Sequence, residues 1–137
     1  MNIKQYIVNN EGLRLKPYRC TAGKLTIGIG RNLEDVGISG EEANLLFEND
    51  LAHCEAGLSR NLPWFSWLDE VRKAVLIDMC FNLGIKGLLG FKTTLSLIEA
   101  KKYTEAAEQM LKSKWAHQVP KRAQRNSRMM TTGQWQT

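Results

Sequence analysis

The stretch EGLRLKPYRCTAGKLTIGIG, residues 11–30, decides the fold of this chain. Apolar residues recur at helical spacing just before it, and Gly12 suits a helix C-terminal cap, so a first helix should end near Glu11. Residues 25–29 alternate in the manner of a β-strand and follow the turn-like residues 21–24. The stretch therefore predicts the end of a short helix next to a hairpin.

Three side chains of this stretch are candidates for hydrolytic chemistry. Glu11 can donate a proton, the thiol of Cys20 can act as a base or a nucleophile, and the hydroxyl of Thr26 can donate one hydrogen bond and accept others. A helix end that faces a hairpin is able to bring such groups to one place. The sequence therefore predicts a hydrolytic site with Glu11 as the acid.

The rest of the chain is predicted to be mainly helical. Ser39, followed three residues later by Glu42, is a capping box and indicates a long helix to about residue 59. Asp69 suits the N-cap of a strongly apolar helix from residue 70 to about 83, which Gly84 ends. Further helices are expected over residues 93–100, from a cap at Thr104 to about 113, and from Pro120 to just before Gly133.

The predicted fold class is α+β. Two or three short antiparallel strands between about residues 14 and 36 are the only β-structure expected. A chain of 137 residues and 15.6 kDa fits one domain, and its hydrophobic share of 43% and charged share of 24% are those of an ordinary globular protein. We therefore expect a small N-terminal sheet lobe and a helical C-terminal lobe joined by the long helix.

Positive charge gathers near the C-terminus. Residues 112–128, called the basic segment below, hold six basic residues and no acidic one, in a chain of net charge +5. Such a patch favours a polyanionic partner, which can be nucleic acid, anionic lipid or an acidic cell-wall polymer. A solvated helix face explains the same charges equally well.

Cysteine usage and hydropathy narrow the classes of protein. The three cysteines, at positions 20, 54 and 80, are scattered and show no C-x-x-C spacing, which argues against a disulfide framework or a zinc site. The N-terminus lacks the apolar core of a signal peptide, and no apolar run approaches membrane-spanning length. We expect no metal or other cofactor, no stable membrane binding, and accumulation in the cytoplasm.

Several segments, in one order along nearly the whole chain, resemble the phage lysozymes of the T-even type. The likeness is that of a compact member, with a shorter connection between hairpin and long helix and a clipped C-terminus. The segments are EGLRLK at 11–16 with Tyr18, TIGIG at 26–30, residues 41–50, residues 68–91, AA at 106–107, KSKW at 112–115, QVPKRA at 118–123 and TGQW at 132–135.

The resemblance implies one lysozyme domain over residues 1–137 with an active-site cleft between two lobes. The sheet lobe would cover about 12–38, the connecting helix about 39–59, and the helical lobe about 60–137, packed with helix 1–11. The activity implied is cleavage of the β-1,4 bond between N-acetylmuramic acid and N-acetylglucosamine in bacterial peptidoglycan. A monomer without nucleic-acid partners is implied, which reaches the wall from the host cytoplasm after a separate pore-former permeabilises the membrane.

The resemblance also assigns roles to residues. Glu11 matches the general acid, and Arg122 matches an arginine that pairs with it. Cys20 stands where the family usually has an aspartate that activates the attacking water, and Thr26 matches a threonine that positions this water. Four further residues match sugar-binding positions: Asn32, Phe81, Thr94 and Gln109.

The sequence leaves several alternatives open. Cys20 can be a base, a nucleophile or an inert thiol, and the stereochemical outcome depends on a carboxyl-to-sulfur distance that the sequence does not contain. A non-catalytic peptidoglycan-binding homologue and a lytic transglycosylase, which uses a hydroxyl of the sugar in place of water, are alternative functions. The hypothesis of a basic nucleic-acid-binding protein has less support, because the basic segment matches no DNA-binding motif.

Overall fold

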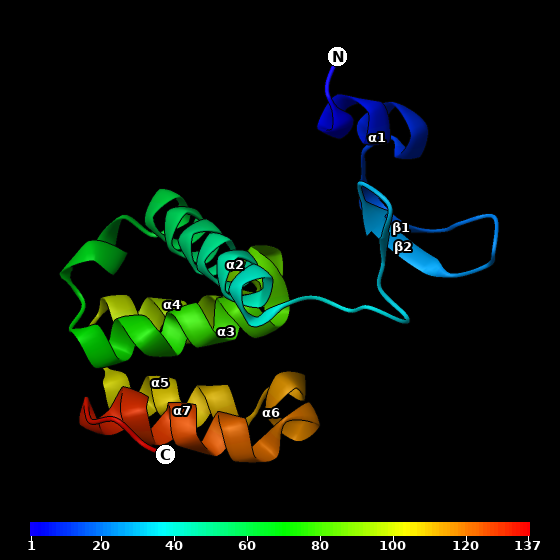
Figure 1. Ribbon diagram of the computed structural model, residues 1–137. Coiled ribbons are helices and arrows are strands. Elements are labelled where there is room, and N and C mark those ends of the chain that lie inside the picture. Colours follow the sequence, from blue (N-terminus) through cyan, green and yellow to red (C-terminus); the bar gives the residue numbers. More distant parts are fainter. The chain divides into compact units, whose positions relative to one another are not determined.

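The computed structural model describes all 137 residues, and most of them are helical. Seven α-helices and one 3₁₀-helix accompany a single three-stranded antiparallel sheet, so the predicted α+β class is confirmed (Figure 1). The chain divides into two compact units, Met1–Leu46 and Phe47–Thr137, which we call unit 1 and unit 2. Helix α2 (Gly40–Asn61) runs across the boundary between them.

Unit 1 begins with helix α1 (Ile3–Glu11), which ends where the sequence predicts. Gly12 caps it with a φ of 74°, and its N–H donates to the carbonyl of Val8 at 2.7 Å. The sheet follows in the order β1 (Arg14–Arg19), β2 (Leu25–Gly28) and β3 (Arg31–Asn32). The pairing of β1 with β2 is irregular around Pro17, because proline has no N–H to donate to a ladder.

The capping box at the start of α2 is confirmed. The N–H of Ser39 donates to Oε1 of Glu42 at 2.8 Å, and the N–H of Glu42 donates to Oγ of Ser39 at 3.1 Å. These two bonds satisfy amide groups that the first helical turn leaves without partners. The helix ends at Asn61, two residues beyond the predicted end.

Unit 2 is helical throughout. Asp69 caps α3 as predicted, since its side chain accepts the N–H of Arg72 at 3.1 Å, and Gly84 breaks the helix with a φ of 78°. A further helical turn follows this break, so the assigned element continues to Leu89. The elements are a 3₁₀-helix (Pro63–Trp67), α3 (Glu70–Leu89), α4 (Lys92–Glu99), α5 (Tyr103–Leu111), α6 (Lys114–Gln118) and α7 (Pro120–Thr132).

Two predicted details of unit 2 need correction. Thr104 is not a cap, because α5 already begins at Tyr103. The preceding turn ends α4 with a backbone motif in which Lys101 is left-handed, at a φ of 61°, and the N–H of Lys102 donates to the carbonyl of Leu97 at 2.8 Å. The sequence analysis also missed the short helix α6, for which Ser113 is the N-cap.

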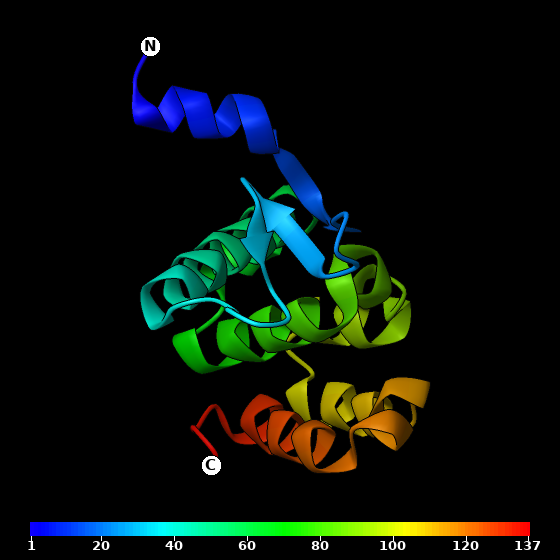
Figure 2. The same cartoon turned by 45° about the vertical axis from the view of Figure 1, so that its right-hand side comes forward.

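The hydrophobic core belongs to unit 2. Helix α5 contacts α4, α6 and α7, and α7 also contacts α3 and α6; α5 and α7 lie side by side in both views (Figures 1 and 2). No single helix of the structure is both long and apolar enough to cross a membrane; α3 and α4 meet that measure only as a pair bent by 103°. The most completely buried side chains are Leu58, Val75, Leu76, Met79, Leu88, Ile98, Met110 and Met130.

Candidate active site

Glu11, the last residue of α1, lies against Gly30 in unit 1. A Cβ atom built on Gly30 would stand 2.7 Å from both Cδ and Oε2 of the Glu11 carboxyl group. Gly30 also has a φ of +68°, a conformation that side chains disfavour. Because Gly30 has no side chain, the Glu11 carboxyl group can occupy the space beside it. The sequence analysis placed Gly30 in the TIGIG motif but did not recognise this contact. The available signal was a glycine at the end of an alternating strand pattern.

Cys20 lies in the tight turn between β1 and β2. Its N–H donates to the carbonyl of Lys24 at 3.0 Å, and its carbonyl accepts the N–H of Gly23 at 2.8 Å. Hydrogen bonding to the backbone amide of Lys24, and then to that of Ala22, lowers the pKa of the Cys20 thiol below its ordinary value. The turn thus surrounds the sulfur with N–H groups that stabilise a thiolate.

Thr26 contacts the same sulfur from β2. It is the one buried residue of unit 1, with 4% of its surface exposed. Its hydroxyl donates to the carbonyl of Lys24 at 2.8 Å, and hydrogen bonding to Cys20 contributes to the lowered pKa of the thiol. A hydroxyl carries one proton, so it donates either to this carbonyl or to the sulfur. Thr26 and Cys20 therefore form one site.

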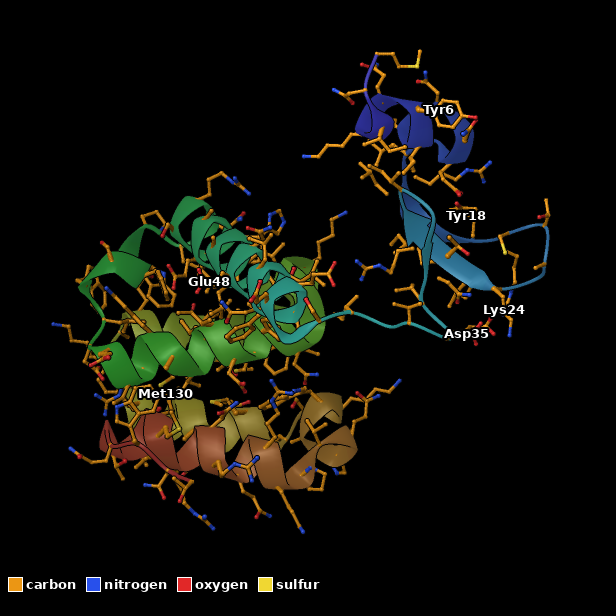
Figure 3. The ribbon with its side chains drawn as sticks, in the orientation of Figure 1. Tyr6, Tyr18, Lys24, Asp35, Glu48 and Met130 are labelled. Carbon is orange, nitrogen blue, oxygen red and sulfur yellow. The ribbon has the colours of Figure 1, made fainter.

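Two cations of the hairpin, Arg19 and Lys24, pair with carboxylates. Arg19 pairs with Glu34 and donates to the carbonyl of Gly23 at 3.1 Å. Arg19 is not among the causes of the lowered pKa of the Cys20 thiol, which come mainly from backbone amides. Lys24 pairs with Asp35 at 3.4 Å in the same unit (Figure 3).

Asn32, a predicted sugar-binding residue, lies in a turn of unit 1. Its Nδ2 donates to Oδ2 of Asp35, and its Oδ1 accepts the N–H of Asp35, both at 3.0 Å. Both ends of the amide thus stabilise the turn that follows β3. One Nδ2 proton and one oxygen lone pair remain for a ligand.

Phe81 and Arg122 line one groove of unit 2, with a volume of about 680 Å³. The ring of Phe81 meets that of Phe47 edge to face, with 5.8 Å between centroids, and 42% of Phe81 is exposed. The guanidinium of Arg122 binds the carboxylate of Asp78 with two hydrogen bonds. The sequence analysis did not single out Asp78. The signal that could have found it was an acidic residue within a strongly apolar helix.

Thr94 and Gln109 line a second groove of unit 2, of about 410 Å³. Thr94 is buried, with 4% of its surface exposed. Lys92 and Lys112 lie along the same groove. Of the predicted residues, Cys20 and Thr26 are in contact in unit 1, which also holds Glu11 and Asn32; Phe81 and Arg122 line one groove of unit 2, and Thr94 and Gln109 line another. No group of three or more side chains that could hold a metal ion is present.

Comparison with known proteins gives one consistent result. The sequence profile described as phage lysozyme matches residues 8–129. A relative from Dictyostelium discoideum, probable T4-type lysozyme 1, is 35% identical over 162 aligned positions that cover 96% of this chain and 95% of the relative. The alignment is longer than the chain, so the relative has residues that this chain lacks.

Two phage proteins are also similar. The endolysin of Acyrthosiphon pisum secondary endosymbiont phage 1 is 31% identical over 114 positions, covering 80% of this chain and 73% of that protein. The pre-baseplate central spike protein Gp5 of Enterobacteria phage T4 is 30% identical over 161 positions, covering 97% of this chain but 28% of that protein. The similarity to Gp5 is thus confined to a part of that larger protein.

Proposed function

The chain belongs to the phage lysozyme family, and from that premise we propose that it cleaves the β-1,4 bond between N-acetylmuramic acid and N-acetylglucosamine. Membership makes the chain a lysozyme, a glycoside hydrolase that acts on peptidoglycan. The single observation that carries the finer proposal is the contact in unit 1 between the hydroxyl of Thr26 and the Cys20 thiol, whose pKa is lowered, in a unit that also holds an acid at the end of α1.

In this proposal Glu11 is the general acid. Departure of the sugar requires that its glycosidic oxygen be protonated while the bond breaks. Glu11 is exposed in unit 1 at the end of α1, and Gly30 leaves room for its carboxyl group. A fixed position against the backbone at Gly30 limits the orientations of the proton donor.

Cys20 acts from the other side of the bond, in place of a carboxylate. The amides of Lys24 and Ala22 favour its thiolate, and Thr26 holds a hydroxyl beside the sulfur. The thiolate then takes a proton from the attacking water, whose oxygen Thr26 orients. A direct attack by sulfur on the sugar would instead leave a covalent glycosyl thioether, which mass spectrometry of the quenched enzyme detects.

Helix α1 carries apolar side chains that unit 1 leaves uncovered. Unit 1 by itself exposes Ile3, Tyr6 and Ile7 on α1, and burying such side chains contributes about 25 cal/mol per Å². We expect Ile7→Asp to lower both activity and the unfolding temperature, while Gln5→Asp on the same helix changes neither. Equal behaviour of the two variants would show that Ile7 contributes no buried surface to the folded enzyme.

The same proposal covers substrate, assembly and location. Phe81 offers an aromatic edge to a sugar ring, and Thr94 and Gln109 offer polar groups to acetamido and hydroxyl groups of the peptidoglycan strand. Asn32 contributes the remaining capacity of its amide. We propose that the enzyme acts as a monomer and reaches the wall from the host cytoplasm after a separate pore-former has opened the membrane.

The test is product analysis of purified peptidoglycan digested by the wild type and three variants. Glu11→Gln should abolish product, Cys20→Asp should retain much of the activity, and Cys20→Ala should lose most of it. Glu48→Gln, at an exposed glutamate of α2, is the matched control and should behave as the wild type.

The chemistry of the new chain ends separates the alternatives. Reducing N-acetylmuramic ends support hydrolysis, whereas anhydro-muramic ends would identify a lytic transglycosylase. Binding of the chain to sedimented walls without any soluble product would identify a non-catalytic binding protein. Full activity of Cys20→Ala would remove the thiol from the mechanism.

A further inference from the structure

The turn between β1 and β2, residues 20–24, is held by a carboxylate to which the proposed function gives no role. Oε1 of Glu34 accepts a hydrogen bond from Nη1 of Arg19, and it also accepts the N–H of Leu25 at 2.9 Å. Nη1 of Arg19 donates in addition to the carbonyl of Gly23 at 3.1 Å. Glu34 therefore binds the chain on both sides of this turn, once directly and once through an arginine.

Glu34 acts as an acceptor where the third strand has already ended. β3 contains two residues, and its pairing with β2 involves Thr26 and Ile27. Leu25 lies one residue outside this pairing, where its carbonyl accepts the N–H of Leu33 at 2.8 Å and its N–H donates to the Glu34 side chain. A side chain thus continues the contact that the short strand begins.

The peptide group between Gly23 and Lys24 matters most for the thiol. Its N–H, from Lys24, is the largest cause of the lowered pKa of Cys20. Its carbonyl, from Gly23, is the one that Arg19 binds. A peptide group is planar, and in the trans form its N–H and its carbonyl point in opposite directions. A contact that fixes the carbonyl therefore also fixes the direction of the N–H.

The next peptide group is held at both of its ends. Its carbonyl, from Lys24, accepts the N–H of Cys20 at 3.0 Å and the hydroxyl of Thr26 at 2.8 Å. Its N–H, from Leu25, donates to Glu34 at 2.9 Å. Two successive peptide planes are thus fixed by hydrogen bonds, so the amide of Lys24 between them keeps one orientation.

We propose that Glu34 is a positioning residue for catalysis, which holds the turn so that the amide of Lys24 faces the sulfur of Cys20. This inference rests on the proposed function, because it takes the Cys20 thiolate as the base that activates the attacking water. Glu34 acts on the sulfur through the backbone of the turn. Arg19 takes part by binding a carbonyl, and its charge is not what favours the thiolate.

The sign of the effect distinguishes this role from a direct effect of charge. The four charges around the turn form two ion pairs, Arg19 with Glu34 and Lys24 with Asp35 (Figure 3), and no charged side chain is among the causes of the lowered pKa of Cys20. Loss of a negative charge alone would lower the pKa of the thiol further. Loss of the acceptor lets the turn reorient, so the hydrogen bond from the amide weakens and the pKa of the thiol rises.

The experiment measures how fast iodoacetamide alkylates Cys20, by mass spectrometry of the peptide that contains it, at a pH below the midpoint of its titration in the wild type. The thiolate is the reacting form, so the rate follows its fraction. Glu34→Ala should slow the reaction by about three- to tenfold, as expected when one hydrogen bond to an anion weakens. Because the base must be ionised, the acidic limb of kcat/KM for peptidoglycan solubilisation should move toward alkaline pH by about half to one unit.

Three variants complete the comparison. Glu34→Gln loses the charge but keeps an oxygen that accepts the N–H of Leu25, so it should react faster than Glu34→Ala. Glu34→Asp keeps the charge and shortens the side chain, so it should react more slowly than the wild type. Glu42→Gln is the control, because it breaks the other glutamate–arginine pair of unit 1 and should leave the rate unchanged.

A merely structural role predicts a different result. The pair of Arg19 with Glu34 is exposed, and exposed ion pairs contribute little to stability, so Glu34→Ala should unfold within a few degrees of the wild type. Slower alkylation at nearly unchanged stability would therefore support the positioning role. An alkylation rate of Glu34→Ala equal to or above that of the wild type would overturn it.

The outcomes also separate this inference from the proposed function. Full activity of Cys20→Ala would remove the thiol from the mechanism, and slower alkylation of Glu34→Ala would then show a fixed turn without catalytic use. An inactive Cys20→Ala together with unchanged alkylation in Glu34→Ala would leave the thiol in place and refute the role of Glu34. If Glu34→Ala does not fold, as far-ultraviolet circular dichroism would reveal, Glu34→Asp decides, because a wild-type alkylation rate would refute the inference.

Discussion

The contact between Glu11 and Gly30 leads to a sharp prediction, because unit 1 contains a matched control. Alanine at position 30 would place a Cβ 2.7 Å from Cδ and Oε2 of Glu11, whereas contacts of 3.4–4 Å are ordinary. The carboxyl group must therefore move by at least about 0.7 Å, the difference between 2.7 and 3.4 Å. Gly28 has a φ of +71° and nothing within 4 Å of its added Cβ, so alanine there brings backbone strain alone.

The magnitudes follow from these two geometries. A non-glycine residue in the left-handed region costs about 1 kcal/mol, so both variants should lower the unfolding temperature by about 3–5 °C. A misplacement near 1 Å at a reacting group costs about 100-fold in rate. Gly30→Ala should therefore be about 10- to 100-fold less active than Gly28→Ala at equal stability, since the end of the glutamate side chain can rotate away at small cost in stability.

The assay pairs thermal unfolding with peptidoglycan solubilisation under saturating substrate. Circular dichroism at 222 nm, a wavelength that reports helix content, establishes whether the two variants share one unfolding temperature. Product release measured on the same preparations then isolates the effect of the displaced carboxyl group. Equal activity of the two alanine variants would refute both the contact and the role of Glu11 as a positioned acid.

Three further predictions concern charge and thiols. Alkylation at neutral pH should modify Cys20 before Cys80, because the pKa of the Cys20 thiol is lowered, whereas burial and the neighbouring thiol raise that of Cys80 to about 12. Peptide mass spectrometry checks the order, and earlier reaction of Cys80 would contradict it. The basic segment should assist wall binding, so activity should fall between roughly 0.01 and 0.3 M salt, and a salt-independent rate would exclude this. Hydrogen bonding from Arg31 lowers the pKa of Glu42 to about 2, so its stabilisation is complete above about pH 4.5 and disappears toward pH 2. Denaturant unfolding across this range should show that dependence weakened in Glu42→Gln and kept in Glu41→Gln.

Features that depend on neighbouring residues along the chain could be predicted from the sequence. The end of α1 at Glu11, the capping box of Ser39 with Glu42, and the break at Gly84 each involve residues no more than four positions apart. Hydrogen bonds over such distances obey local rules, and no tertiary contact is needed to foresee them. The same holds for Pro120, which begins α7 as expected.

The features that the sequence analysis missed are of two kinds. Asp78 meets Arg122 across 44 residues, and Glu11 meets Gly30 across a hairpin, so both contacts exist only once the fold has formed. The start of α5 was missed for another reason, because Lys101 adopts the left-handed conformation that glycine usually takes at the end of a helix. A pattern that looks for glycine at such an end passes over a lysine.

The environment of Cys20 supports the proposal that a thiol serves here in place of a carboxylate. A carboxylate is ionised at neutral pH in any ordinary surroundings, whereas a free thiol is mostly protonated. The hairpin supplies the difference through fixed dipoles, because the amides of Lys24 and Ala22 favour a negative sulfur without a neighbouring cation. An ionised aspartate at position 20 would meet the same amides, which is why Cys20→Asp should keep much of the activity. Alanine would leave those donors with only water to bind, so the hairpin would keep its shape and lose its charge.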